Sequence, residues 1–193
     1  VACAPREQTI VLLHTNDSHG SILPVSGVGG MAERATVIDS LRKLYSNKIL
    51  LLDAGDFNTG QAVSNMFCAR PDILAYNYMK YDAVTLGNHE FEFRNDKDPI
   101  ETFTTILDCE EDEHAVINGY HFIRLCPSVE TKGYGYGEEK QEWLLEELNK
   151  AKEDTPDKPI FVMNHHAVLD TVYGTENTTW GSNSLKDVLS KFP

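Results

Sequence analysis

The chain has 193 residues, of which 41% are hydrophobic, and its formal net charge is -13. This length predicts one large domain with a substantial buried core. No stretch approaches the roughly 18 apolar residues that a membrane span needs. The acidic surplus argues against a nucleic-acid polymer as partner, because such binding uses Lys and Arg to neutralise phosphates. A small phosphorylated partner would need local attraction, which a divalent metal centre can supply.

The four cysteines are Cys3, Cys68, Cys109 and Cys126. They show no C-x-x-C spacing, which argues against a structural zinc site. The opening Val1-Ala2-Cys3 has two interpretations. It resembles the end of a bacterial lipobox, in which the cysteine is lipidated and anchors the protein to a membrane. The protein would then be exported, to the cell envelope or to the outside of the cell. It is equally compatible with a tether in a disordered tail at residues 1–8. A single disulfide of undetermined pairing is also open.

The first expected strand is the apolar run at residues 9–13, which is typical of a central parallel strand buried on both faces. It leads to Asp17 and His19. In an extended segment these two side chains leave the backbone on the same side, so they can share one metal ion. The alternative is that Asp17 caps a turn and His19 is solvated. Glycines at 27, 29 and 30 then precede an amphipathic helix expected at residues 31–45.

A second expected strand, at residues 48–52, leads into Asp53. Gly55 allows a sharp turn just before Asp56. Because a carboxylate has two oxygens that can bridge two cations, Asp56 is the expected shared ligand of a dinuclear site. Asp53 is expected to be a hydrogen-bonded support residue. Pro71 is expected to open a helix that ends near residue 79, since proline is favoured at the first helical position.

The third expected strand, at residues 83–86, delivers Asn88, His89 and Glu90. Asn and His are both metal ligands, and His is also the commonest proton donor in catalysis. The intervals from Asp17 to Asp56 and from Asp56 to Asn88 each fit one strand-helix-strand unit. Such units keep strands parallel and bring their C-terminal ends to the edge of the sheet where ligands bind. We therefore expect these side chains to gather there.

The middle of the chain contains a hairpin signal. Asn118-Gly119 suits a type I′ turn between two apolar runs, and the flanking His114 and His121 are interpreted as ordinary strand and surface residues. The other elements expected in the second half are a helix at 99–109, strands at 115–117 and 120–125, a loop at 133–137, a helix at 138–152, a strand at 160–163 and a helix at 184–191.

The strand at 160–163 delivers Asn164, His165 and His166. Two adjacent histidines at a strand end point in different directions, so at most one is expected to reach the shared metal. The other is expected to orient a substrate or contact the protein.

Four motifs in chain order resemble the calcineurin-like metallophosphoesterase superfamily. They are Asp17-Ser18-His19, Gly55-Asp56, Gly87-Asn88-His89-Glu90 and the isolated His165. Ala167 stands where the family pattern usually has proline, which leaves the choice between His165 and His166 open. The stretches Leu13-His14-Thr15-Asn16-Asp17 and Gly29-Gly30-Met31-Ala32-Glu33-Arg34-Ala35-Thr36 are similar to the 5′-nucleotidase branch. Gln141-Glu142-Trp143-Leu144 and the following His-His strand instead look like short bacterial phosphatases.

The resemblance implies an α/β fold, a sandwich with mixed, largely parallel sheets, and two divalent transition-metal ions. Mn, Fe, Zn and Co all suit such mixed ligands. Carried over residue by residue, it places Asp17 and His19 on the first ion, Asp56 between both ions, and Asn88 with His165 on the second ion. The implied reaction is hydrolysis of a phosphomonoester or phosphodiester, including nucleotides, by a metal-bridging hydroxide.

The same resemblance implies the remaining roles in the site. His89 is expected to stabilise the transition state or protonate the leaving oxygen, with Asp56 or Glu90 as its orienting partner. Asn88, His89 and His166 are the expected substrate contacts.

One departure from the family pattern affects the predicted site. The Gly-His-x-His block that supplies two further ligands is not among residues 1–193. Three explanations are open: the chain is a fragment, another segment completes the site, or the site is impaired. We expect the first, so residues 9–193 are predicted to form a catalytic domain truncated before its last ligand block. The rival interpretation is a non-catalytic cell-surface binding module with the same fold.

Overall fold

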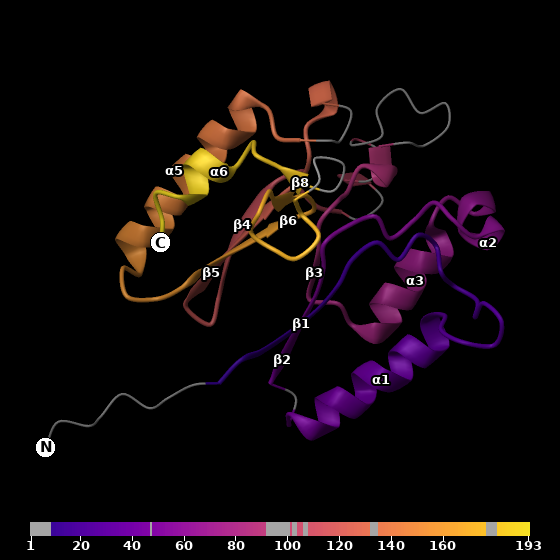
Figure 1. Ribbon diagram of the computed structural model, residues 1–193. Helices are drawn as coiled ribbons and strands as arrows, with labels where there is room; N and C mark the ends of the chain where they lie inside the picture. Colours follow the sequence, from indigo (N-terminus) through magenta and orange to yellow (C-terminus); the bar gives the residue numbers. More distant parts are fainter. Residues whose placement is uncertain are drawn as a thin grey trace, which may run out of the picture.

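The computed structural model describes residues 9–46, 48–91, 101, 104–105, 108–131, 135–176 and 181–193. Figure 1 shows two sheets side by side between outer helices, with α1 and α3 beside one sheet and α5 and α6 beside the other. This mixed arrangement confirms the predicted α/β fold class.

The first sheet is fully parallel and has the order β1-β2-β3. Its strands are β1 (Val11–Thr15), β2 (Ile49–Asp53) and β3 (Ala83–Val84). The helix α1 (Met31–Leu44) connects β1 to β2, and the helices α2 (Ala62–Met66) and α3 (Arg70–Met79) connect β2 to β3. The two predicted strand-helix-strand units are therefore confirmed. Thr15 pairs with Asp53, and Asp53 pairs with Val84, so the strands end at one edge.

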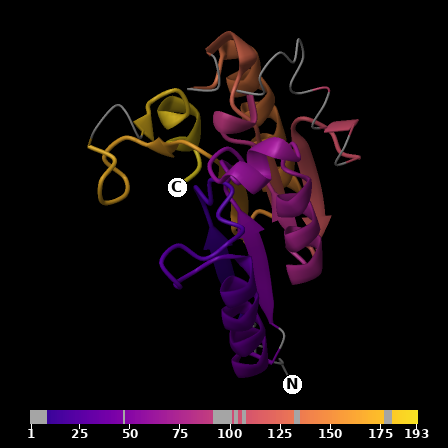
Figure 2. The same cartoon turned by 90° about the vertical axis from the view of Figure 1, so that its right-hand side faces the viewer.

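The core of this half lies between the sheet and its helices. Figure 2 shows α1 running alongside β1 and β2. Ile38 of α1 packs in the same buried cluster as Leu51 of β2. Leu12 of β1, in contrast, is 45% exposed. The prediction of a first strand buried on both faces is therefore wrong for the described residues, because β1 is the outermost strand of this sheet and its side chains alternate between two faces.

The second sheet has the order β4-β5-β6. The strands β4 (Glu113–Ile117) and β5 (Tyr120–Leu125) form the predicted antiparallel hairpin, and β6 (Ile160–Asn164) lies parallel to β5. Asn118 and Gly119 have φ values of 54° and 76°, which a type I′ turn requires. The hairpin prediction is confirmed.

The remaining elements are two helices, a separate two-stranded sheet and two 3-10 turns. The helix α5 (Glu138–Asp154) buries Leu144 and Leu148 in a cluster that also contains Val188 of α6 (Lys186–Leu189). Two short strands, β7 (Ala167–Val168) and β8 (Gly181–Ser182), pair in parallel. Two single 3-10 turns are η1 (His89–Phe91) and η2 (Val129–Thr131). The sequence did not predict α2, β7 or β8.

The two sheets are joined where β3 approaches β5. The Thr85 hydroxyl donates a hydrogen bond of 3.1 Å to the Leu125 carbonyl oxygen. The next residue, Cys126, is fully buried in the cluster that forms the core of the first half. The carboxyl end of β5, and of β6 beside it, is thereby held against the first sheet.

Several expectations fall on residues outside the described ranges. These are the tail at 1–8 with Cys3, most of the helix expected at 99–109, and residues 133–134 of the expected loop. Cys68, Cys109 and Cys126 are free thiols. Among the described residues, no helix combines the length and apolar character that crossing a membrane requires.

Candidate metal centre

The turns after β1 and β2 pair with each other through their backbones. The Asp17 amide donates to the Gly55 carbonyl oxygen at 3.1 Å, and the His19 amide donates to the Asp56 carbonyl oxygen at 2.9 Å. Asp17, His19 and Asp56 have φ values of 52°, 44° and 55°. The predicted extended conformation around Asp17 and His19 is therefore wrong, because the cross-turn bonds hold both residues in the left-handed region. Such strained residues concentrate at functional sites.

Glycine is required where these turns meet the end of β3. A Cβ atom on Gly87 would overlap the Asp56 carboxylate, and one on Gly55, whose φ is 97°, would overlap the Gly87 backbone. The glycines therefore allow the third turn to lie directly against Asp56. The predicted Gly-Asp and Gly-Asn-His blocks are thus in direct contact in the structure.

Two groups of possible metal ligands share Asp56. One group is His19, Asp56 and His89, and the other is Asp17, Asp56 and His165. Within each group the ligand atoms lie within 4.8 Å of one another. The Nε2 atoms of His165 and His89 are 3.4 and 3.9 Å from Asp56 Oδ2. Asp and His donors at these separations fit one or two divalent transition-metal ions.

The structure brings together five of the predicted site residues. The two groups place Asp17 with His165 and His19 with His89, while His19 Nε2 also lies 3.4 Å from Asp17 Oδ1. Asp56 is common to both groups, and the assignment of each ligand to an ion stays a prediction. Asn88 is buried at the same edge, immediately before His89.

The Asp56 carboxylate and the imidazoles beside it stabilise each other's charged forms. Burial alone would raise the pKa of Asp56, but the hydrogen bond and charge of His165 and the contacts of His89 outweigh it and hold this pKa below its ordinary value. Burial would lower the pKa of His165, but the Asp56 carboxylate outweighs it and raises this pKa. The Asp56 carboxylate is therefore held ionised beside its imidazole neighbours.

Glu90 makes backbone contacts that the sequence did not predict. It is fully buried and accepts backbone N–H bonds from Asp56 at 2.9 Å, Phe57 at 3.0 Å and Gly87 at 2.7 Å. Burial, with the nearby Asp56 charge, raises the pKa of Glu90 to about 7. Glu90 thus holds two turns together through their backbones. The amide of His89 donates to Asp56 Oδ1 at 2.9 Å, and the choice between Asp56 and Glu90 as orienting partner of its ring stays a prediction.

Asp53 supports the cluster from below, as predicted. Its carboxylate accepts hydrogen bonds from the Thr15 hydroxyl at 2.5 Å, the Gly55 amide at 2.9 Å and the Tyr76 hydroxyl at 2.9 Å. Burial raises the pKa of Asp53. These bonds connect the ends of β1 and β2 to α3.

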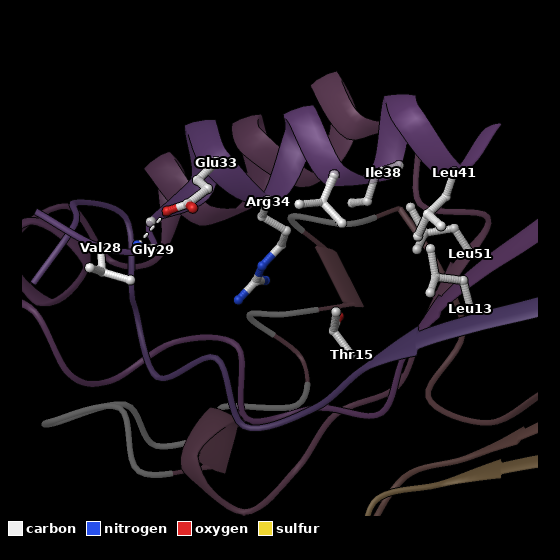
Figure 3. A pocket seen from close by; sticks show the side chains of 11 residues that line it. Leu13, Thr15, Val28, Gly29, Glu33, Arg34, Ile38, Leu41 and Leu51 are labelled. Carbon is white, nitrogen blue, oxygen red and sulfur yellow. Dashed lines mark hydrogen bonds between the residues drawn. The ribbon is translucent and has the colours of Figure 1, made fainter. Parts of the chain in front are cut away.

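Arg34 reaches from α1 towards the same edge, as Figure 3 shows in a groove of about 400 Å³. Its Nη1 atom donates to the Ser18 hydroxyl at 2.8 Å and contacts the Tyr76 hydroxyl at 3.4 Å. Because Ser18 stands between Asp17 and His19, Arg34 ties the first turn to the helix layer. Sequence reasoning included Arg34 in a family stretch but assigned it no role.

The two adjacent histidines after β6 point in different directions, as predicted. Nδ1 of His165 is 2.8 Å from the Ala54 carbonyl oxygen, and the His166 ring lies at 83° to the His165 ring. Burial, with a smaller contribution from His165, lowers the pKa of His166 to about 4. His166 belongs to neither ligand group. Both backbone amides donate to the Tyr136 hydroxyl, a contact that sequence reasoning missed.

A cavity of about 700 Å³ lies beside the candidate ligands. Ala54 and His165 line it at the cluster, and Asn16, Asn164 and Lys186 are among its polar lining residues. Most of the surface that lines it is apolar. The cluster is therefore next to an open space of the size of a small-molecule site.

The fold and this cluster define an α/β sandwich with a candidate metal centre where its parallel strands end. The chain belongs to the calcineurin-like phosphoesterase family, whose sequence profile matches residues 10–193. The predicted resemblance is confirmed.

Among curated proteins, the chain is similar to UshA proteins and to 5′-nucleotidases over less than half its length. It is 42% identical over 87 residues to the silent protein UshA(0) of Salmonella typhimurium, a match covering 43% of this chain and 16% of that protein. It is 42% identical over 93 residues to a 5′-nucleotidase of Vibrio cholerae, which covers 46% of this chain and 17% of that protein. The matched region is therefore a small part of each relative.

Solved structures share the fold at low sequence identity. The NAD nucleotidase NadN of Haemophilus influenzae aligns with a TM-score of 0.61 at 21% identity, covering 82% of this chain and 34% of that one. A 5′-nucleotidase precursor of Thermus thermophilus aligns with a TM-score of 0.57 at 23% identity, covering 81% and 37% of the two chains. The chain thus spans about a third of the length of these structures.

Proposed function

We propose that this protein hydrolyses phosphate esters at a dinuclear metal centre and that nucleotides are among its substrates. The main observation behind this proposal is that Asp56 belongs to both ligand groups and has a left-handed backbone conformation. A shared carboxylate is what a pair of adjacent cations requires. The membership of the calcineurin-like phosphoesterase family supports the same chemistry.

In this proposal the ligands are Asp17, His19, Asp56, Asn88 and His165. When bound, the ions supply Lewis-acid activation of the phosphate ester and of water. The protein holds its donors in place beforehand, through the Glu90 bonds to the turn backbones and the Asp53 bonds beneath them. Little reorganisation is then needed when the ions and the substrate bind.

His89 is the proposed catalytic residue. Its amide is fixed on Asp56 at 2.9 Å, and its ring makes an edge contact with His19 at a centroid distance of 4.8 Å. From this position the imidazole can donate a proton to a leaving oxygen. His166 and Asn88 stay proposed substrate contacts. His166 belongs to neither ligand group, so its proposed contact is with the substrate and not with an ion.

The nucleotide preference rests on the relatives. Proteins described as 5′-nucleotidase and as NAD nucleotidase share this family or fold. A substrate with a phosphate ester and an aromatic base also suits the mainly apolar cavity beside His165. Export fits the same picture, because the Thermus thermophilus relative is described as a precursor. Anchoring through a lipidated Cys3 stays a prediction.

The test is metal content and hydrolysis measured on the same purified protein. Elemental analysis after loading with Mn²⁺ is expected to give two equivalents. Hydrolysis of p-nitrophenyl phosphate, its bis-ester, adenosine 5′-monophosphate and NAD is then compared. Asp56→Asn is expected to lose at least about 100-fold in kcat/KM and most of its bound metal, because one oxygen donor and one charge disappear.

The matched control is Asp39→Asn, the same chemical change on the solvent side of α1, where the Asp39 side chain is 64% exposed. It is expected to keep the metal content and the rate of the unsubstituted protein. Less than one equivalent of metal with no turnover on any of the four substrates would contradict the proposal and favour the binding-module interpretation.

A further inference from the structure

Tyr136 lies just before α5 and connects that helix to the candidate metal centre. Its side chain is 2% exposed and belongs to the apolar cluster of the second sheet. Its hydroxyl oxygen accepts the backbone N–H of His165 at 3.0 Å and that of His166 at 3.2 Å. One buried oxygen therefore binds two consecutive amides of the turn that carries the metal-ligand candidate.

These amides follow the end of β6, where the ladder to β5 stops at Asn164. Buried backbone donors need an acceptor, and a missing one costs about 1 to 3 kcal/mol. The Tyr136 hydroxyl supplies an acceptor at this position. Its contact sets the direction in which the chain leaves the strand.

Tyr136 is itself held on several sides. Its carbonyl oxygen accepts a hydrogen bond of 2.7 Å from Gln141 Nε2 in the first turn of α5. The residues on either side are bound by Ser128, whose amide donates to Gly135 at 2.8 Å and whose hydroxyl accepts from Gly137 at 2.7 Å. The phenol is thus a fixed support rather than an adaptable side chain.

The held backbone decides which histidine faces the cluster. With the turn in this conformation, His165 Nδ1 reaches the Ala54 carbonyl oxygen at 2.8 Å. A carbonyl oxygen can only accept, so Nδ1 carries a proton, and when the ring is neutral Nε2, 3.4 Å from Asp56 Oδ2, is its free donor atom. The His166 ring leaves the same turn at 83° to the His165 ring.

The geometry points to Tyr136 as a positioning residue that selects His165, and not His166, as the metal ligand and fixes its Nδ1-protonated tautomer. This role rests on the proposed metal function. It acts through the backbone amides and not through contact with a substrate. It also answers the question that the adjacent histidines leave open in the sequence.

Tyr136→Phe removes a single oxygen atom and keeps the ring that packs in the cluster. Binding of Mn²⁺ alone, measured by calorimetry, is expected to weaken by about 10- to 100-fold for one ion, the range seen when the partner of a metal ligand is removed. In the metal-free protein, the amides of His165 and His166 are expected to exchange faster with solvent. At a pH where the His165 ring is neutral, its ¹⁵N shifts are expected to show a mixture of tautomers.

Two controls separate positioning from general destabilisation. Tyr120→Phe removes the same atom at the opposite end of β5 and is expected to leave all three measurements unchanged. Leu148→Ala opens the same apolar cluster without touching the hydroxyl. It is expected to lower the melting temperature but to leave the His165 tautomer unchanged.

Unchanged amide exchange and an unchanged tautomer in Tyr136→Phe would overturn the inference. Equal changes in Leu148→Ala would overturn it as well, because loosening of the cluster would then be sufficient. Failure of the unsubstituted protein to bind Mn²⁺ would contradict the proposed function instead. The two measurements on the metal-free protein would still decide whether Tyr136 orders the turn.

Discussion

Asp56 is constrained at its backbone and at its side chain by different parts of the chain. Its amide donates to Glu90, its carbonyl oxygen accepts from His19, and its Oδ1 accepts from the His89 amide. Gly87 allows this approach because a Cβ there would overlap the carboxylate. The left-handed conformation of Asp56 is therefore enforced by neighbours, and its cost is offset by these three hydrogen bonds, of about 1 kcal/mol each.

His166 provides a pH prediction at the residue scale. Burial, helped by His165, lowers its pKa to about 4, below the value of about 6.5 expected in the unfolded chain. As the pH falls, the unfolded chain therefore binds this proton first. The stability that neutral His166 contributes is complete above pH 6.5 and is lost between pH 6.5 and 4. In His166→Gln, the free energy of unfolding that is lost between pH 6.5 and 4 is expected to be smaller by up to about 3 kcal/mol.

Urea unfolding of the metal-free protein at several pH values between 4 and 7 measures the effect. His14→Gln is the matched control, because His14 is exposed and the same replacement there is expected to leave the profile unchanged. Parallel pH profiles for His166→Gln and the unsubstituted protein would contradict the prediction.

At the scale of the elements, the positions of several strands and helices followed from periodicity. The apolar runs that lead to the candidate site residues form β1, β2, β3 and β6, with boundaries shifted by at most two residues. Alternation and helical spacing are properties of neighbouring residues, so a sequence displays them directly. The predicted convergence of Asp17, Asp56 and His165 at strand ends came from the same local signals.

The conformations inside the turns could not be predicted in this way. Asp17 and His19 are left-handed because of bonds to Gly55 and Asp56, which lie on another turn. The Tyr136 contact to the residues after β6 joins positions about thirty apart in the chain. Such contacts exist only after the sheets have packed, so no local pattern encodes them.

His114 and His121 show the same limitation between elements. The sequence suggested ordinary strand and surface residues, and His121 is indeed a strand residue of β5, but a buried one whose contacts were not predicted. His114 Nε2 is 2.8 Å from His121 Nδ1, and the outer ring nitrogens contact Glu147 at 2.6 Å and Asp154 at 3.1 Å. The chain of contacts ties the hairpin β4-β5 to α5.

A double-mutant cycle tests this connection. His114→Phe and His121→Phe are each expected to lower the free energy of unfolding by about 1 to 3 kcal/mol, because each leaves a polar partner unmatched. The double variant is expected to lose less than the sum, with a coupling energy of about 0.5 to 3 kcal/mol. Urea unfolding at pH 7 measures all four proteins.

The control cycle combines His114→Phe with Tyr45→Phe, a change at the exposed end of α1. These two changes are expected to be additive within about 0.5 kcal/mol. Additive losses for the two histidines would show that their contact contributes nothing to stability and would contradict the prediction.

At the scale of the whole molecule, the candidate metal centre lies where the two sheets meet. Asp17, His19, Asp56 and His89 follow strands of the first sheet, and His165 follows β6 of the second. The His165 contacts to Ala54 and Asp56 therefore cross between the two halves. An ion held by Asp56 and His165 would fasten one sheet to the other in addition to the apolar packing between them.

This placement predicts that metal binding stabilises both sheets together. Mn²⁺ at 100 times its dissociation constant is expected to add about 2.7 kcal/mol to the free energy of unfolding, and EDTA is expected to remove it. Amide exchange is expected to slow in β2 and in β6 alike. Asp56→Asn is expected to abolish the Mn²⁺ effect and Asp39→Asn to retain it. Slower exchange in β2 alone would mean that the ion does not join the sheets, since a ligand from each half must protect both.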